Sequence, residues 1–149
     1  MTVRDSFAVQ APIDKVFDLL ADPRWLTGTD AARGVRIWHD GGPERGVGSR
    51  FLMEGPRSRG TWASECTEFV PPTALVLDVW REGDQRHGTT SYQLEATADG
   101  TQVLLRGDGF FGIGGSVVLR FLSPLFRGYL QGGNRRLARA IEERVALTP

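Results

Sequence analysis

The sequence has few of the residues that mark a secreted, disulfide-bonded or membrane-spanning protein. Cys66 is its only cysteine, so no disulfide can form within the chain, and we expect a cytoplasmic location. No run of about 18 apolar residues occurs, which predicts no membrane span. Residues 1–6 contain no apolar stretch, so we also expect no signal peptide.

The chain also lacks an excess of charge of either sign. Its 18 basic and 18 acidic side chains give zero net charge, and Lys15 is the only lysine, an arginine bias that we attribute to a GC-rich genome. Without a basic stripe or tail, neither nucleic acid nor an anionic membrane is an expected partner. His39 and His87 have no cysteine or carboxylate at metal-ligand spacing, so we predict no metal site and no cofactor.

The 149 residues suit a single domain, residues 1–149, in which strands precede a late helix. Residues 2–10 alternate as a first strand. Ala11 and Pro12 open a helix that Asp22 and Pro23 end, and a short helix follows at residues 24–27. Turn residues then separate six further strands, near 33–39, 47–55, 60–70, 74–82, 87–97 and 101–111. The short connections predict an antiparallel meander.

Residues 115–145 are predicted to form one long C-terminal helix. Apolar residues recur along it at helical spacing, at Phe126, Leu130, Leu137 and Ile141. A sheet followed by such a helix predicts an α+β fold, in which a curved antiparallel sheet wraps around the helix. A concave sheet can enclose a cavity, so we predict that the function depends on a small molecule held inside.

Four short sequence segments point to a known protein family. They are residues 11–23 (APIDKVFDLLADP), 46–51 (GVGSRF), 62–72 (WASECTEFVPP) and 99–103 (DGTQV). With the closing helix, they resemble the SRPBCC superfamily, the START-related and pollen-allergen-like helix-grip fold, and within it the polyketide cyclase/dehydrase family. The resemblance covers essentially the whole chain and implies the order β-α-α-β6-α. Members bind lipids, sterols, hormones or polyketides, and only some are enzymes, so the fold alone does not assign the function.

The strand at 60–70 presents two different faces. One carries Ala63, Glu65, Thr67 and Phe69, and the other carries Trp62, Ser64, Cys66 and Glu68. Neither face is cleanly apolar. The resemblance favours the first set as the one that faces the cavity, because the pocket residues of cyclase-type relatives occupy the same alternate positions of this strand, a phase that we call the inward parity. It also puts Phe69 where an aromatase-type relative has its pocket arginine, which weakens a cyclase interpretation.

The expected cavity wall follows from this parity. Besides Glu65 and Tyr92, we predict ligand contacts from Thr67, Phe69, Leu77, Val79, Arg81, Leu94, Val103, Leu105, Phe126, Leu130, Gly133 and Leu137. Most of these side chains are apolar, as a small-molecule pocket requires.

Glu65 and Tyr92 are the candidate catalytic residues. A carboxylate on an apolar face tends to keep its proton unless it is paired, and could then serve as a general acid or base or hold a ligand hydroxyl. Arg81, diagonally across the predicted hairpin, is the expected partner of Glu65. The alternative is a bulge that turns Glu65 to solvent. Tyr92 combines an apolar ring with a polar tip, which suits either a pocket or a plain core.

Three functions remain open at this stage. The leading prediction is a monomer or weak homodimer that binds a small hydrophobic molecule, such as a lipid, polyketide-like aromatic or isoprenoid, between sheet and C-terminal helix. The alternative is a cofactor-independent enzyme resembling polyketide cyclases or dehydratases, with Glu65 and Tyr92 managing proton transfer. A third is an interaction module resembling the chaperone-ATPase activators of the superfamily, which a filled cavity and an exposed apolar patch would favour.

Overall fold

One antiparallel sheet carries the fold. A computed structural model describes residues 2–27, 29, 32, 34–55, 61–109 and 134–147. Within these residues the seven strands follow the order β1-β7-β6-β5-β4-β3-β2. They are β1 (Thr2–Val9), β2 (Arg36–His39), β3 (Arg50–Glu54), β4 (Trp62–Val70), β5 (Ala74–Arg81), β6 (His87–Thr97) and β7 (Gly100–Asp108). The helical elements are α1 (Ile13–Ala21), the short 3-10 helix η1 (Pro23–Leu26), and a C-terminal helix described over residues 134–146.

The predicted antiparallel meander is confirmed. Strands β2 to β7 pair in succession, and β1 adds to the far edge by pairing with β7. The strand predicted at 47–55 begins only at Arg50, because Gly46 and Gly48 take positive φ values of 104° and 91° in the preceding turn. The C-terminal helix is also confirmed. Its predicted beginning at residue 115 lies outside the described residues.

Local sequence explains where α1 begins and ends. Pro12 stands at its N-cap in an extended conformation, and Val16, Phe17 and Leu20 form its buried face. Asp22 is extended, as expected for a residue before proline, so the helix stops there and η1 begins at Pro23. The Asp22 side chain accepts a 3.1 Å hydrogen bond from the Arg24 amide, which caps η1.

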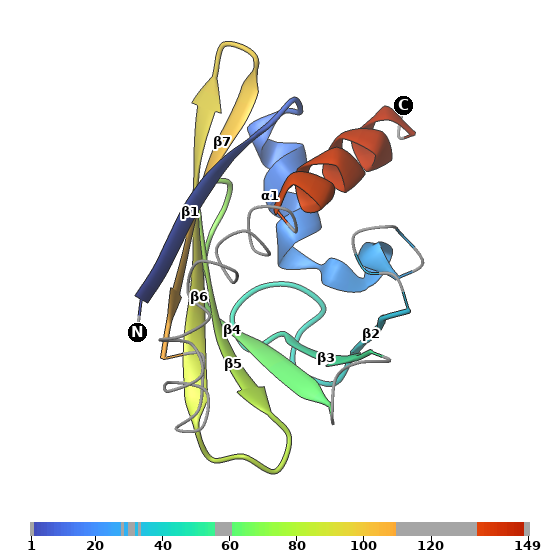
Figure 1. Ribbon diagram of the computed structural model, residues 1–149, viewed down its shortest axis with the longest axis vertical. Coiled ribbons are helices and arrows are strands. Elements are labelled where there is room, and N and C mark those ends of the chain that lie inside the picture. The colour runs from blue at the N-terminus through green and yellow to red at the C-terminus, as the bar shows by residue number, and fades with distance from the viewer. Residues whose placement is uncertain are drawn as a thin grey trace, which may run out of the picture.

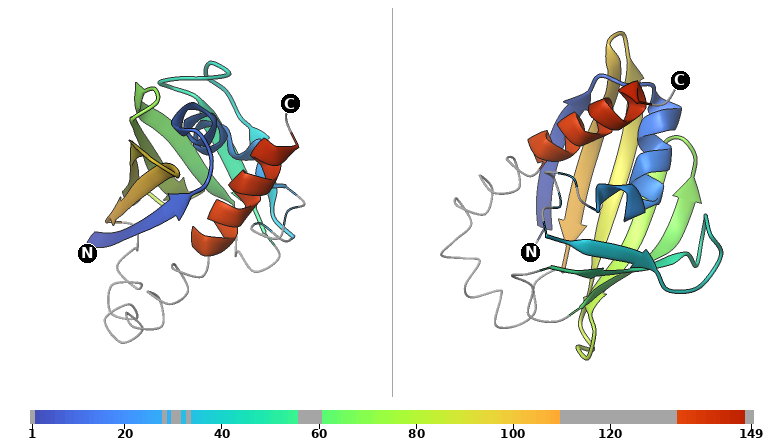
Figure 2. Two further views of the ribbon diagram at one scale, coloured as in Figure 1. Left: turned by 90° about the horizontal axis from the view of Figure 1, so that it is seen from above. Right: turned by 90° about the vertical axis from the view of Figure 1, so that its right-hand side faces the viewer.

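The sheet is curved, and α1 and the C-terminal helix lie on the same face of it (Figures 1 and 2). Side chains from this face and from both helices form the main core, which includes Phe7, Val9, Phe17, Leu75 and Ile141. Thr101, itself buried, donates a 2.8 Å hydrogen bond to the Ala11 carbonyl and fastens the β6–β7 turn to the start of α1. No helix in the described part of the chain is long and apolar enough to cross a membrane.

A β-bulge in β4 decides which side chains face the helices. The register with β5 shifts between Cys66 and Glu68, so Thr67 is an extra residue in the strand. Because side chains alternate, one extra residue exchanges the two faces. Of the predicted inward set, Glu65 and Thr67 are therefore wrong, whereas Phe69 packs against the core and Ala63 is buried and lines the cavity. The helix-facing side carries Trp62, Ser64 and Cys66 before the bulge and Phe69 after it.

Candidate functional site

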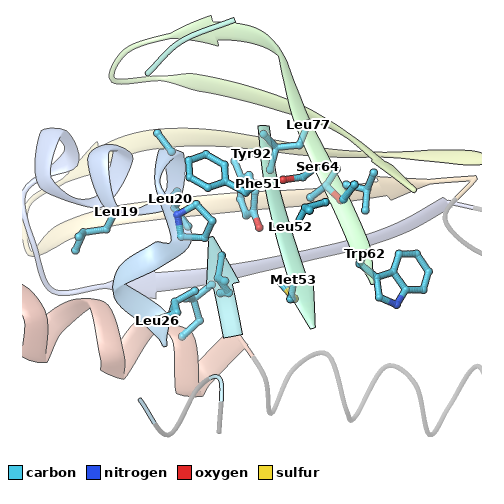
Figure 3. A pocket seen from close by; sticks show the side chains of 17 residues that line it. Leu19, Leu20, Leu26, Phe51, Leu52, Met53, Trp62, Ser64, Leu77 and Tyr92 are labelled. Carbon is cyan, nitrogen blue, oxygen red and sulfur yellow. The ribbon is translucent and has the colours of Figure 1, made fainter. Parts of the chain in front are cut away.

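A cavity lies on the side of the molecule away from β1. This cavity of about 400 Å³ lies between the sheet and the helical segments (Figure 3). Figure 3 shows Ser64, Leu77 and Tyr92 on its sheet side and Leu19, Leu20 and Leu26 on its helical side. Its described lining consists of Leu19, Leu20, Ala21, Pro23, Leu26, Ile37, Phe51, Leu52, Met53, Trp62, Ala63, Ser64, Leu77, Val79, Thr90, Tyr92 and Leu137.

Strands β4, β5 and β6 form the floor of the cavity. Register places Ser64 beside Val79, and Leu77 beside Thr90, so these side chains share one face of the sheet. Tyr92 follows Thr90 on the same face of β6, two residues along. Gly88 is the register partner of Val79 and has no side chain, which leaves space beside Val79.

The end of α1 and the η1 helix form the opposite wall. The Trp25 indole nitrogen donates a 2.7 Å hydrogen bond to the Leu19 carbonyl, so η1 folds back against α1. The Ile37 amide donates to the Thr27 hydroxyl at 3.3 Å, which attaches the end of η1 to β2. These two hydrogen bonds, each between a side chain and the backbone, hold η1 and its Leu26 side chain close to the sheet.

Ion pairs connect this wall to the β2–β3 loop. Arg24 contacts Asp22 at 2.7 Å and Glu44 at 3.0 Å, and its guanidinium lies 5.7 Å from the Phe51 ring centre. The Arg24 guanidinium also holds the pKa of Asp22 below its ordinary value, against the opposing effect of burial. These pairs are largely exposed, so they position the wall and add little stability.

A second ion pair fixes the β2–β3 loop itself. Arg45 contacts Asp18 of α1 at 2.6 Å, and its guanidinium lies 5.2 Å from the Phe69 ring centre. Gly42, at φ 71°, lets the loop close on itself, because a Cβ there would overlap the Gly48 carbonyl. The Arg45–Asp18 ion pair therefore attaches this loop to α1.

The described lining is apolar apart from four residues: Trp62, Ser64, Thr90 and Tyr92. None of the described lining side chains carries a charge. Burial raises the pKa of Tyr92, so its phenol stays protonated at neutral pH. Met53 lines the cavity and is 41% exposed, which marks where the cavity reaches the surface beside β3.

The structure separates the predicted site residues into four groups. Leu77, Val79, Tyr92 and Leu137 line the cavity. Phe69, Leu94 and Val103 pack into the main core instead, where the Phe69 ring meets Phe17 edge-on at 5.2 Å. Thr67, Arg81 and Leu105 are not among the described lining residues. Phe126, Leu130 and Gly133 lie outside the described residues.

The expected position of Glu65 is wrong. Its register partners are Arg50 and Asp78, on the face of the sheet turned away from the helices, while Arg81 is paired with Trp62. No ion pair between Glu65 and Arg81 occurs among the described residues. The physical reason is the bulge at Thr67, which reverses the parity on which the expectation depended. Glu65 and Tyr92 therefore do not form one catalytic pair.

Neither histidine belongs to the described lining, although the His39 ring meets the lining residue Phe51 edge-on at 5.4 Å. His87 bonds Asp78 through Nδ1 at 2.8 Å and stacks on Trp80, with ring centres 4.7 Å apart. His39 Nε2 lies 3.2 Å from the Pro43 carbonyl oxygen. Among the described residues no three histidine, cysteine or acidic side chains are grouped as metal ligands.

Sequence reasoning missed the wall made by α1, η1, β2 and β3. Leu19 and Leu26 belong to short helical turns whose orientation depends on tertiary contacts. Phe51 and Met53 do alternate along β3, and Ile37 is apolar in β2, so an alternation argument could have proposed them. It would still have needed the sheet register to choose the face.

Comparison with known families decides the relationship. The family model described as polyketide cyclase / dehydrase and lipid transport matches residues 1–142. The chain belongs to this family. Membership in the polyketide cyclase / dehydrase and lipid transport family agrees with the apolar cavity. Among curated proteins, none matches the sequence.

Solved structures share the fold at low identity. CV1439 from Chromobacterium violaceum superposes with a TM-score of 0.70 at 18% identity, over 95% of this chain and 97% of that one. DynU16, a protein of the dynemicin biosynthetic locus, gives 0.65 at 23% identity over 95% of this chain and 47% of its own. StfQ, a di-domain ARO/CYC protein from the steffimycin biosynthetic pathway, gives 0.67 at 17% identity over 97% and 51%. This family member thus spans about half of the last two proteins.

Proposed function

We propose that this protein binds a small hydrophobic molecule, such as a lipid, a polyketide-like aromatic or an isoprenoid, in the cavity between the sheet and the helices. The observation that carries the proposal is the cavity itself. Its volume of about 400 Å³ falls within the range of small-molecule sites, and all but four of the 17 described lining residues are apolar. Transfer of apolar ligand surface from water into such a site is favourable.

The cyclase or dehydratase alternative has one observation in its favour. Tyr92 presents a protonated phenol to the cavity and could polarise a ketone of a folded chain. However, Glu65 lies on the other face of the sheet, and the described lining offers Tyr92 no carboxylate or histidine as a partner. Binding therefore explains the site with fewer assumptions. An interaction module with a filled cavity fits poorly, because about 400 Å³ of space is left between the described lining residues.

Displacement of a neutral fluorescent dye tests the proposal. N-phenyl-1-naphthylamine should bind the wild-type protein saturably, and fatty acids, fatty alcohols or aromatic polyketides should displace it. Val79→Phe adds a ring inside the cavity and should weaken dye binding about tenfold or more, through steric overlap.

The matched control is Val76→Phe, the same substitution on the same strand. Val76 pairs with Glu68 and Ser91 and faces away from the cavity, so dye binding should persist. Absence of saturable dye binding by folded wild-type protein would refute the proposal, and so would equal loss in both variants. If the dye binds as expected, native mass spectrometry of protein purified from its own host should reveal the mass of a retained ligand.

A further inference from the structure

Tyr92 is half-buried and faces the cavity. Its neighbours in register on the same face are Leu75 and Leu105, and neither side chain can accept a hydrogen bond. The phenol oxygen makes no hydrogen bond to any described residue, although the ring lines the cavity. The phenol oxygen is not among the fully buried atoms that lack a partner in the described part of the chain, so it remains accessible from the cavity. A ligand that covers the phenol without accepting its hydrogen bond would leave it unpaired, which is costly, so a ligand with an acceptor at this point is favoured.

Two further hydroxyl groups lie on the same wall. Thr90 precedes Tyr92 by two residues on the same face of β6, with Cα atoms about 7 Å apart at strand spacing. Ser64 lines the cavity from β4, beside Val79. Neither hydroxyl makes a hydrogen bond within the described part of the chain. Figure 3 shows Ser64 and Tyr92 directed into the same cavity from their separate strands.

The arginines near the cavity lie outside its described lining. Arg24 bonds Asp22 and Glu44, Arg45 bonds Asp18, and Arg50 lies over the Trp80 ring at 5.0 Å. Arg81 lies beside Trp62 on the cavity face of the sheet and is exposed. A carboxylate or phosphate entering this cavity would lose its hydration, and the described lining would offer it only uncharged donors in exchange, which is unfavourable for a full charge.

We infer that the ligand is an uncharged molecule with a carbonyl or similar oxygen, and that this oxygen accepts a hydrogen bond from the Tyr92 phenol on the sheet side of the cavity. Thr90 and Ser64 provide weaker secondary donors beside it. The rest of the ligand is apolar and contacts the leucine-rich wall of α1 and η1. This inference rests on the proposed function and adds the class of ligand and the residue that orients it.

Three probes of similar shape test this assignment. They are 2-acetylnaphthalene, which has a ketone, 2-isopropylnaphthalene, in which the oxygen is replaced by carbon, and 2-naphthoate, which is charged. Each is titrated into the wild-type protein and into Tyr92→Phe, and its affinity is measured by displacement of N-phenyl-1-naphthylamine. Tyr92→Phe removes only the hydroxyl, and circular dichroism verifies that the fold is retained.

Tyr92→Phe should weaken the ketone about 3- to 10-fold and change the hydrocarbon less than about twofold, as loss of one neutral hydrogen bond predicts. Wild-type protein should bind 2-naphthoate at least about tenfold more weakly than the ketone, because the described lining carries no cation. Thr90→Val should weaken the ketone by a smaller factor. Its control is Thr89→Val, on the opposite face of β6 beside Asp78 and Asp108, which should change neither affinity.

Two results would overturn the inference while the proposed function stands. One is an equal effect of Tyr92→Phe on ketone and hydrocarbon, and the other is binding of 2-naphthoate as tightly as the ketone. If the dye and all three probes fail to bind the folded wild-type protein, the proposed function itself fails, and the ligand assignment with it.

Discussion

The contact between Asn134 and Asp5 gives a sharp test of how the C-terminal helix is attached to the sheet. The Asn134 amide nitrogen donates to an Asp5 carboxylate oxygen at 2.5 Å, and Asn134 is only 7% exposed. Ala138 and Ile141, at helical spacing from Asn134, are buried in the main core. In the described part of the helix, the inward side chains thus include a polar one that reaches β1.

Asn134→Leu keeps the branched skeleton of the side chain, with methyl groups in place of the amide, and leaves the half-buried Asp5 carboxylate without its amide donor. A hydrogen bond to a charged group contributes about 1.5–3 kcal/mol, so the free energy of unfolding should fall by about that amount. For a domain of this size the melting temperature should fall by about 4–10 °C. Urea denaturation followed by tryptophan fluorescence measures the change. Arg136→Ala, at an exposed position of the same helix, should change stability by less than about 0.5 kcal/mol.

The double variant Asp5→Leu with Asn134→Leu separates a hydrogen bond from simple packing. Replacement of both partners by apolar groups should be less harmful than the sum of the single changes, because no carboxylate is left without a donor. We expect a coupling energy of about 1–2 kcal/mol. Additivity of the two single changes within about 0.3 kcal/mol would refute the reasoning, because independent sites behave in that way.

Three further predictions concern single residues. Gly100→Ala should cost about 2 kcal/mol or more in urea denaturation, since φ is 155° and a Cβ would overlap the Val9 carbonyl; an unchanged midpoint would contradict this. Cys66 is 5% exposed, and burial raises the pKa of its thiol. At pH 8 the thiol of the native protein should therefore react with a disulfide reagent only as the protein unfolds, and fast labelling of the native protein would contradict this expectation. Arg86 lowers the pKa of Asp84 to about 2, so the stabilisation that this ion pair gives the β5–β6 turn should be lost as the pH falls toward 2. In the Arg86→Ala variant, NMR titration should find the pKa of Asp84 closer to 3.8.

Much of the fold follows from short-range information in the sequence. Alternation along β5 and β6 predicts that Leu77, Val79 and Tyr92 share a face, and register between neighbouring strands preserves that relation. The limits of α1 follow from Pro12 and from Asp22 before Pro23, since proline restricts the backbone on both sides. Such features depend on residues a few positions apart, so they are accessible without coordinates.

Tertiary structure decided the position of Glu65 and the extent of the cavity. The bulge at Thr67 depends on how β4 pairs with β5, and a shift of one residue moves Glu65 from one face to the other. Leu94 and Val103 have the inward parity expected of cavity residues, but α1 and the C-terminal helix pack against them and leave no space. The cavity of the described residues lies where η1 and the β2–β3 hairpin form the wall. Local pattern specifies which way a side chain points, whereas a cavity exists only where no other element packs against it.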